Sequence, residues 1–230
     1  MKRLAGYPHK NKNERTHNMP KIEIDKPEDL QYCLNPGNNL SFIGRRPKDL
    51  CGYVKGAYDN LVTWLSDRIY TEYYQNKNVR NFITSGAQGF GQLAFWAVEH
   101  MRRAHRLDDI ANIVFCVRDQ EKHWAKTGSP FCADEYNRML RMADTVLWIE
   151  GGAVKSLFEC NHQLAKNAEY MLALYPDSNW GVGTGGTSEC MRFAATRLKK
   201  DGKGILEDLS RISYTISKNS IKPTEIIRCA

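Results

Sequence analysis

The sequence lacks the features that define several classes of protein. It has no apolar run close to the roughly 18 residues that a membrane-spanning helix needs, and no apolar stretch follows its polar, basic N-terminus as it does in an export signal. Its seven cysteines are scattered, with no Cys-x-x-Cys pair and no histidine at zinc-finger spacing. We therefore expect a soluble, cytoplasmic protein with reduced thiols, no metal and no cofactor.

Basic residues are concentrated near the N-terminus. The 230-residue chain has 33 Lys and Arg against 26 Asp and Glu, a net charge of +7. Residues 1–21 hold six basic side chains and one acidic side chain, which leaves the remainder close to neutral. A solvated tail is the simpler interpretation, and an arm that binds nucleic acid is the alternative. We expect residues 1–39 to form a basic, flexible segment and residues 40–230 to form one domain.

Short apolar runs alternate with longer amphipathic stretches along the chain. The apolar runs predict strands at 40–44, 81–85, 112–117, 145–149 and 170–175, with a weaker sixth strand at 213–217. The amphipathic stretches predict helices at 50–74, 88–106, 134–143, 157–167 and 188–200. This alternation is typical of a doubly wound α/β fold of the Rossmann type, with a mostly parallel sheet and helices on both faces.

Ligands of such a sheet bind beyond the carboxyl ends of the strands, so the residues that follow each strand are the most informative. The first predicted strand ends at Gly44, which is followed by Arg45 and Arg46. A guanidinium group beside a flexible glycine suits a phosphate or a carboxylate. A solvated basic turn is the alternative interpretation of this segment.

The second predicted strand ends at Ser85 and Gly86 and runs through Gly89 into a helix. Amide groups at a helix N-terminus attract anions, so this turn predicts an anion or ribose-phosphate site. Tight packing of the strand on the helix explains the glycines equally well. Asn161, near the start of a later helix, is a further candidate for ligand contact.

The loop after the third predicted strand contains Arg118, Gln120 and Trp124. A cation, an amide and an indole in one loop suit a charged, planar heterocycle. Trp124 serves equally well as an anchor of the loop on the core. This loop therefore predicts contacts to the base or the ribose of a ligand, and leaves the role of the tryptophan open.

The turn within residues 181–190 carries the strongest signal because it combines glycines with hydroxyl side chains before a predicted helix. These residues supply an adaptable backbone and several hydrogen-bond donors, which favours phosphate binding over a plain loop. They are Gly183, Thr184, Gly185, Gly186, Thr187 and Ser188. The glycine-rich turn within residues 83–92 does not have the G-x-G-x-x-G spacing of dinucleotide sites, and the turn within residues 181–190 does not have the G-x-x-x-x-G-K-[ST] spacing of P-loop NTPases.

Taken in order, these segments resemble the SLOG superfamily and, most closely, its YpsA-like branch. The similar motifs are Gly44–Pro47, Ser85–Gly89, Gln120 with Trp124, Tyr136 and Ala143–Asp144, Asn161–Gln163 before Leu174–Asp177, and Gly185–Thr187 before Arg192–Ala194. This Rossmann-like superfamily includes the Lonely Guy phosphoribohydrolases and DNA-processing protein A. The resemblance implies a pocket that senses or sequesters a nucleotide or a nucleotide-derived molecule, such as an ADP-ribose-type or cyclic nucleotide signal.

Two departures from the family patterns bear on the activity. Gly91 stands where YpsA-like proteins usually carry an acidic residue, and Glu189 follows Thr187 by two residues where Lonely Guy enzymes place their catalytic Glu three residues on. Glu189 is still the candidate catalytic residue if the chain hydrolyses the N-glycosidic bond of a nucleoside monophosphate. Single-stranded DNA binding is a second alternative. The resemblance also implies a homodimer or higher homo-oligomer, and the aromatic segment Tyr70–Tyr74 is either an interface or a solvated helix face.

Overall fold

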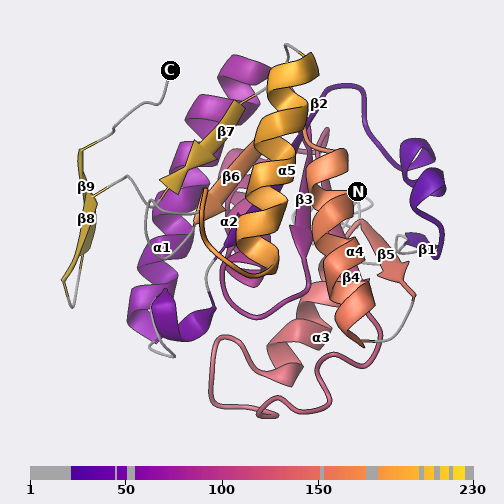
Figure 1. The fold of residues 1–230 in the computed structure, drawn as a ribbon. Helices are drawn as coiled ribbons and strands as arrows, with labels where there is room; N and C mark the ends of the chain where they lie inside the picture. Colours follow the sequence, from indigo (N-terminus) through magenta and orange to yellow (C-terminus); the bar gives the residue numbers. More distant parts are fainter. Residues whose placement is uncertain are drawn as a thin grey trace, which may run out of the picture.

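The computed structural model describes residues 22–44, 46–50, 55–150, 153–174, 181–201, 205–209, 213–217 and 220–225. Its central sheet consists of seven parallel strands (Figure 1): β1 (Ile22–Ile24), β2 (Asn38–Gly44), β3 (Val79–Ser85), β4 (Ala111–Val117), β5 (Thr145–Ile149), β6 (Tyr170–Leu174) and β7 (Ile205–Asp208). Their order across the sheet is β1-β5-β4-β3-β2-β6-β7. The chain therefore proceeds from β2 outward to β5, and then returns to the other side of β2 for β6 and β7.

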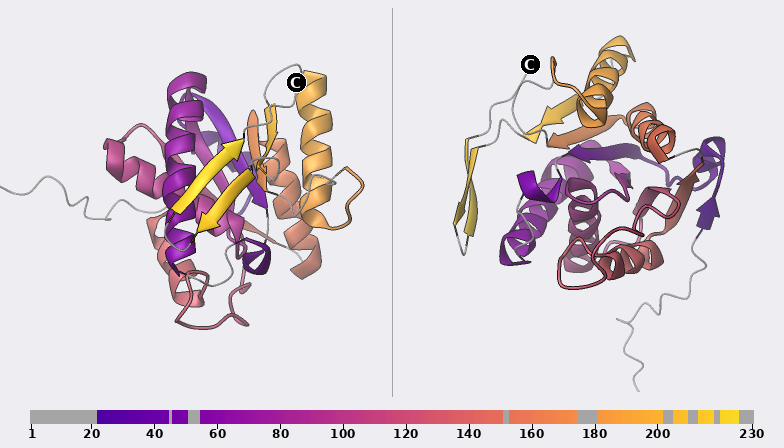
Figure 2. Two further views of the ribbon diagram at one scale, coloured as in Figure 1. Left: turned by 90° about the vertical axis from the view of Figure 1, so that its left-hand side faces the viewer. Right: turned by 60° about the horizontal axis from the view of Figure 1, so that its bottom comes forward.

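Helices cover both faces of this sheet (Figures 1 and 2). One face carries α1 (Lys55–Arg68), α2 (Phe90–His105) and α3 (Ala133–Met142), and the other carries α4 (Ala153–Lys166) and α5 (Gly186–Asp201). Side chains alternate along a strand, so Phe42 of β2 packs in the core under α1 and α2, whereas Ile43 packs in the core under α4 and α5. The predicted doubly wound, Rossmann-like α/β fold is confirmed.

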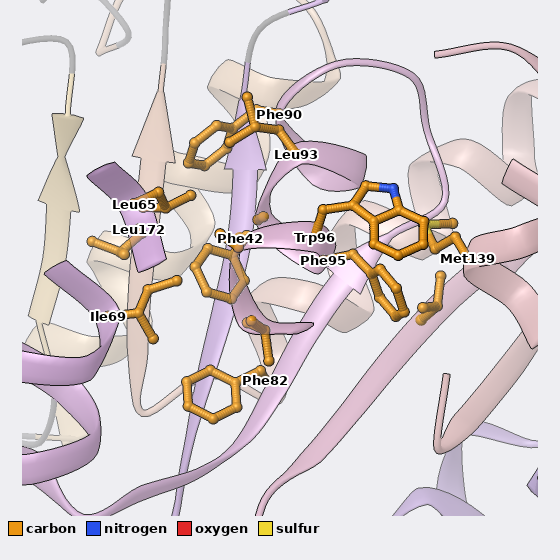
Figure 3. Close-up of a cluster of buried hydrophobic side chains, with 14 of the residues drawn as sticks. Phe42, Leu65, Ile69, Phe82, Phe90, Leu93, Phe95, Trp96, Met139 and Leu172 are labelled. Atoms are coloured by element: carbon orange, nitrogen blue, oxygen red, sulfur yellow. The ribbon is translucent and has the colours of Figure 1, made fainter. Parts of the chain in front are cut away.

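Aromatic side chains fix α2 on the sheet. Phe42 of β2 and Phe82 of β3 are fully buried beneath this helix, together with Phe95 of the helix itself (Figure 3). Phe90, the first residue of α2, meets Phe42 edge-on with 6.4 Å between ring centroids. Because burial of each large aromatic contributes several times the thermal energy, the N-terminus of α2 is held over the end of β2.

The five main predicted strands and the five predicted helices are confirmed to within a few residues. The predicted sixth strand does form, but β8 (Ser213–Ser217) pairs antiparallel with β9 (Ser220–Glu225) in a separate two-stranded sheet. The edge strands β1 and β7 were not predicted, because each is short and carries acidic residues rather than an apolar run. No helix within the described ranges is long and apolar enough to cross a membrane.

Part of the segment expected to be flexible up to residue 39 lies against the domain. Strand β1 pairs with β5, with Ile22 opposite Thr145. A 3₁₀-helical turn at Pro27–Tyr32 follows, and its Leu30 is fully buried in the core under α4 and α5. Residues 1–21, which carry the basic cluster, lie outside the described residues.

A cluster around Glu207 attaches the edge strand β7 to the helical layer. A π-helical turn, Ile69–Gln75, continues α1, and its Tyr73 donates a hydrogen bond to Glu207. Arg68 forms an ion pair with the same carboxylate. Burial, followed by the negative charge of Glu207, raises the pKa of Tyr73 far above its usual range. The phenol therefore stays protonated and keeps donating.

A buried polar network joins α2 to β4 and to the start of β5. Arg102 donates to Glu99 at 2.9 Å and to the carbonyl oxygen of Ile110 at 3.1 Å, and it also pairs with Asp144. Asn112 donates its side-chain amide to Glu99 at 3.0 Å. The exposed fraction of Glu99 is only 3%, so its charge depends on these two donors for compensation.

Replacing this central cation is expected to destabilise the fold strongly. Arg102→Met should lower the free energy of unfolding by about 3–5 kcal/mol, because it leaves the buried carboxylate of Glu99 without its cation. Arg103→Met, at the exposed neighbouring position, is the matched control and should change it by less than about 0.5 kcal/mol. Urea unfolding monitored by circular dichroism measures both values. Similar losses in the two variants would contradict this role for Arg102.

Candidate functional site

A cavity of about 360 Å³ lies at the carboxyl ends of β2, β3 and β4 and extends between the start of α2, the first half of α4 and the start of α5. The position coincides with the reversal of strand order between β2 and β6. In doubly wound sheets the helices on either side of such a reversal leave the sheet in opposite directions, which opens a crevice for ligands. The volume falls in the range of small-molecule sites.

The cavity brings together eight of the residues predicted from the sequence. They are Gly44, Arg46, Ser85, Gly86, Gln120, Asn161, Gly186 and Thr187. Eight others lie outside the lining: Gly89, Arg118, Trp124, Gly183, Thr184, Gly185, Ser188 and Glu189. Arg45 lies outside the described residues.

The turn after β3 folds back tightly on its own strand. Gly89, the residue before α2, has a φ angle of +107°, which residues other than glycine rarely adopt. A Cβ atom on Gly91 would lie 2.6 Å from Oγ and 2.7 Å from the carbonyl oxygen of Ser85. The buried side chain of Gln92 donates to the carbonyl oxygen of Gly86 at 3.1 Å. The glycines therefore serve tight strand–helix packing, and this packing places the start of α2 at the cavity.

The turn before α5 is held by a hydroxyl and a cation from the first two turns of that helix. The carbonyl oxygen of Gly183 accepts hydrogen bonds from Oγ of Ser188 at 2.8 Å and from Nη1 of Arg192 at 2.7 Å. Nη1 of Arg192 also donates to Oγ of Ser188 at 2.6 Å. Because these contacts join the helix to the turn that precedes it, Ser188 is a positioning residue for the start of α5.

The residues of this turn divide between the cavity and the exterior. Gly186 and Thr187 line the cavity, while Thr184 and Gly185 are exposed to solvent outside it. Asn161 of α4 approaches Gly186 closely, with its Nδ2 atom 2.6 Å from the position that a Cβ atom there would take. Of the predicted phosphate-binding turn, only the first residues of α5 therefore reach the cavity. The side-chain amide of Asn161 from α4 lies beside them.

The loop after β4 supplies one cavity residue and an anchor. Gln120 lines the cavity, and its Nε2 atom donates to the hydroxyl of Tyr136 at 2.9 Å. Trp124 packs edge-on against the same tyrosine ring at 5.1 Å and is partly buried against the core. Of the two roles left open for Trp124, this packing supports the anchor.

The two arginines described at the strand ends differ in their environment. Arg46 lines the cavity and is exposed to solvent. Arg118 is directed towards β5 and the end of β1, where it pairs with Asp25 at 2.8 Å and its guanidinium lies 4.8 Å from the centre of the Trp148 ring. Arg118 therefore stabilises the contact between β5 and the N-terminal strand region.

The cavity has a positive side chain and no negative one among its described lining residues. Glu189 is exposed on the first turn of α5 and outside the lining. Cys160 lines the cavity, but burial, followed by the neighbouring Cys116 and Cys190, raises the pKa of its thiol well above the usual value. A thiol that stays protonated is a poor nucleophile and a poor metal ligand. Within the described residues, no cluster of His, Cys, Asp or Glu is arranged to hold a metal ion.

Sequence reasoning missed several residues of the cavity. Gln88 belongs to the glycine-rich turn after β3, and its position between Gly86 and Gly89 was a usable signal. Leu157 and Phe158 of α4 line the mouth of the cavity with exposed fractions of 36% and 49%. In the sequence they look like any other apolar positions on a helix, so nothing there distinguished them from core residues.

The close approach at Gly91 can be tested by adding a single methyl group. Gly91→Ala should lower the free energy of unfolding by about 1–3 kcal/mol, because the new Cβ atom meets the backbone of Ser85. Gly56→Ala is the control, since that glycine is an exposed position of α1 with nothing within 4 Å of the new atom. It should raise the free energy of unfolding by about 0.5–1 kcal/mol. A stabilising effect of Gly91→Ala in thermal or urea unfolding would disprove the tight turn.

Comparison of the sequence with protein-family models finds no match, and comparison with curated proteins finds no match either.

Proposed function

We propose that the cavity binds a nucleotide or a nucleotide-derived small molecule, which the protein senses or sequesters. The observation that carries this proposal is the position of one cation, three carboxamide side chains and the starts of two long helices around a single cavity at the strand reversal. A nucleotide combines a negative phosphate with polar sugar and flat ring groups. An ADP-ribose-type or cyclic nucleotide signal has the same parts.

The phosphate belongs at the side where Arg46 and the first residues of α5 line the cavity. Amide groups in the first turn of a helix have no partner within the helix, and the helix dipole favours an anion there. Arg46 adds a mobile positive charge at the exposed rim. This arrangement supports one phosphate site. We assign a second phosphate contact to Arg45, the neighbouring residue in the sequence.

The base belongs at the mouth of the cavity, on Leu157 and Phe158. These apolar side chains are exposed, yet they line the same cavity as the polar groups. Exposed apolar surface beside convergent polar groups is typical of a site that binds a flat, amphipathic ligand. The proposal therefore moves the base contact from Trp124, which packs on Tyr136, to α4.

The motif order that resembles the SLOG superfamily supports the same proposal. Five of its segments contribute to one cavity, through Gly44, Ser85, Gln120, Asn161 and Gly186. Membership of the YpsA-like branch remains part of this proposal. So does a homo-oligomer, although Tyr70 of the candidate interface stacks on Tyr74 and His105 of its own chain.

Native mass spectrometry of the purified protein is the direct test of binding. A copurifying small molecule with the mass of a nucleotide derivative supports the proposal and identifies the ligand. If the purified protein carries no small molecule, binding is measured instead by isothermal titration with AMP, ADP-ribose and cyclic AMP. If native spectra show no bound molecule and none of the three compounds binds, the proposal is wrong.

The contribution of Arg46 can be measured in the same titrations. Arg46→Gln should weaken nucleotide binding about fivefold or more, because hydrogen bonds to a charged group contribute more than neutral ones even where solvent reduces them. Arg118→Gln is the matched control, since its partner is Asp25 outside the cavity. Affinity for the nucleotide should stay unchanged in this variant. An equal loss in both variants would show that phosphate binding does not involve the cavity.

The position of Glu189 disfavours the alternative of N-glycosidic hydrolysis. Its side chain is exposed outside the lining, and none of the described lining residues is a carboxylate that could stabilise an oxocarbenium-like centre. We expect no base release from AMP by the wild-type protein and the same result with Glu189→Ala. Base release that disappears in Glu189→Ala, measured by chromatography, would establish the enzyme instead.

Single-stranded DNA binding depends on residues 1–21, outside the described residues, and receives no support from the cavity.

A further inference from the structure

Two glutamines at the cavity each donate one side-chain N–H to a partner within the protein. Nε2 of Gln88 donates to the carbonyl oxygen of Phe131 at 2.6 Å, and Nε2 of Gln120 donates to the hydroxyl of Tyr136 at 2.9 Å. Both side chains also line the cavity. Since a carboxamide nitrogen carries two N–H groups, each side chain keeps its oxygen and one N–H for a ligand. Among the described residues, no hydrogen bond ends on either oxygen.

The partners fix these orientations. The carbonyl oxygen of Phe131 only accepts, so a flipped Gln88 would bring two oxygens together. Burial, followed by the neighbouring Cys116 and a hydrogen bond to its sulfur, raises the pKa of Tyr136, so its hydroxyl keeps its proton. The hydroxyl oxygen of Tyr136 accepts the hydrogen bond from Nε2 of Gln120.

The two glutamines act on the same end of the cavity. Nε2 of Gln120 lies 2.5 Å from the position that a Cβ atom on Gly86 would take, and Gln88 is two residues further along the same turn. The absence of a side chain at Gly86 is therefore what admits Gln120 to this end. A hydroxyl group both donates and accepts, so it can use the oxygen and the remaining N–H of a carboxamide, whereas an acceptor-only phosphate can use the N–H alone.

We propose that Gln88 and Gln120 together recognise the 2′,3′-diol of an unmodified ribose in the nucleotide, and so select ribonucleotides over their deoxy and ribose-phosphorylated counterparts. This inference rests on the proposed function, since it assigns one part of the same ligand. The sugar then lies between the phosphate near Arg46 and the base on Leu157 and Phe158.

The test is a set of titrations with the full chain, using AMP or ADP-ribose, whichever binds more tightly, and its 2′-deoxy counterpart. The wild-type protein should bind the ribose form about threefold to tenfold more tightly, the effect of one neutral hydrogen bond. Gln120→Met has a similar shape without the acceptor, and should bind the two forms equally. Gln88→Met provides the second variant, with the same loss of preference. The control, Gln75→Met, changes an exposed residue distant from the cavity lining and should keep the full preference.

The outcomes separate this inference from the proposed function. If none of the nucleotides binds to the wild-type protein, the proposed function fails and the diol site fails with it. If AMP or ADP-ribose binds but the 2′-deoxy form binds equally well, only the diol site is wrong. A preference for AMP over IMP that disappears in Gln120→Met, with no ribose preference, would assign the two acceptors to the amino group of the base and overturn the inference.

Discussion

The cavity and everything around it depend on the position of β2 between β3 and β6. Gly44, the last residue of β2, pairs with Leu174 of β6, and Ser41 of β2 pairs with Ile83 of β3. On one side of β2 the strands β3, β4 and β5 follow in chain order, whereas β6 and β7 on the other side arrive only after a long return. As a result α2 and α5 start at the same edge of the sheet but diverge onto opposite faces, and the space between their first residues cannot be filled by either helix. The site follows from the topology, and the side chains then determine its chemistry.

How much of this could be predicted from the sequence differs between the fold and the site. The inner strands are buried on both faces, so their apolar runs are visible in the sequence, as in Phe42 and Ile43. The edge strand β1 has a solvent-exposed side and alternates Ile with Glu, so its pattern carries little signal. Strand ends indicated where ligand groups gather, and Gly44, Ser85 and Gln120 do meet there. The direction in which a side chain points was not predictable: Arg118 follows β4 but turns towards Asp25.

Many residues that looked like ligand contacts are occupied in shaping the site. Ser188 and Arg192 are joined to Gly183, and Trp124 supports Tyr136. A turn rich in glycine and hydroxyl residues can thus serve in two ways. It can bind a ligand directly, or its hydrogen bonds can fix the local backbone so that neighbouring residues bind the ligand. In this chain the second use dominates, which leaves the cavity with carboxamides, a single described cation and apolar side chains. Such a lining suits recognition of a neutral polar group more than acid–base chemistry.

The pairing of β1 with β5 has a consequence for how the protein is made. Ile22, Glu23 and Ile24 leave the ribosome early, but their hydrogen-bonding partners Thr145, Val146 and Leu147 are synthesised much later. Strand β1 must therefore wait, unpaired, while the inner strands assemble, and it adds to the sheet only when β5 is in place. Its shortness and its central Glu23 keep this exposed segment from joining other chains during the delay. The features that made β1 inconspicuous in the sequence are the ones that a late-joining strand needs.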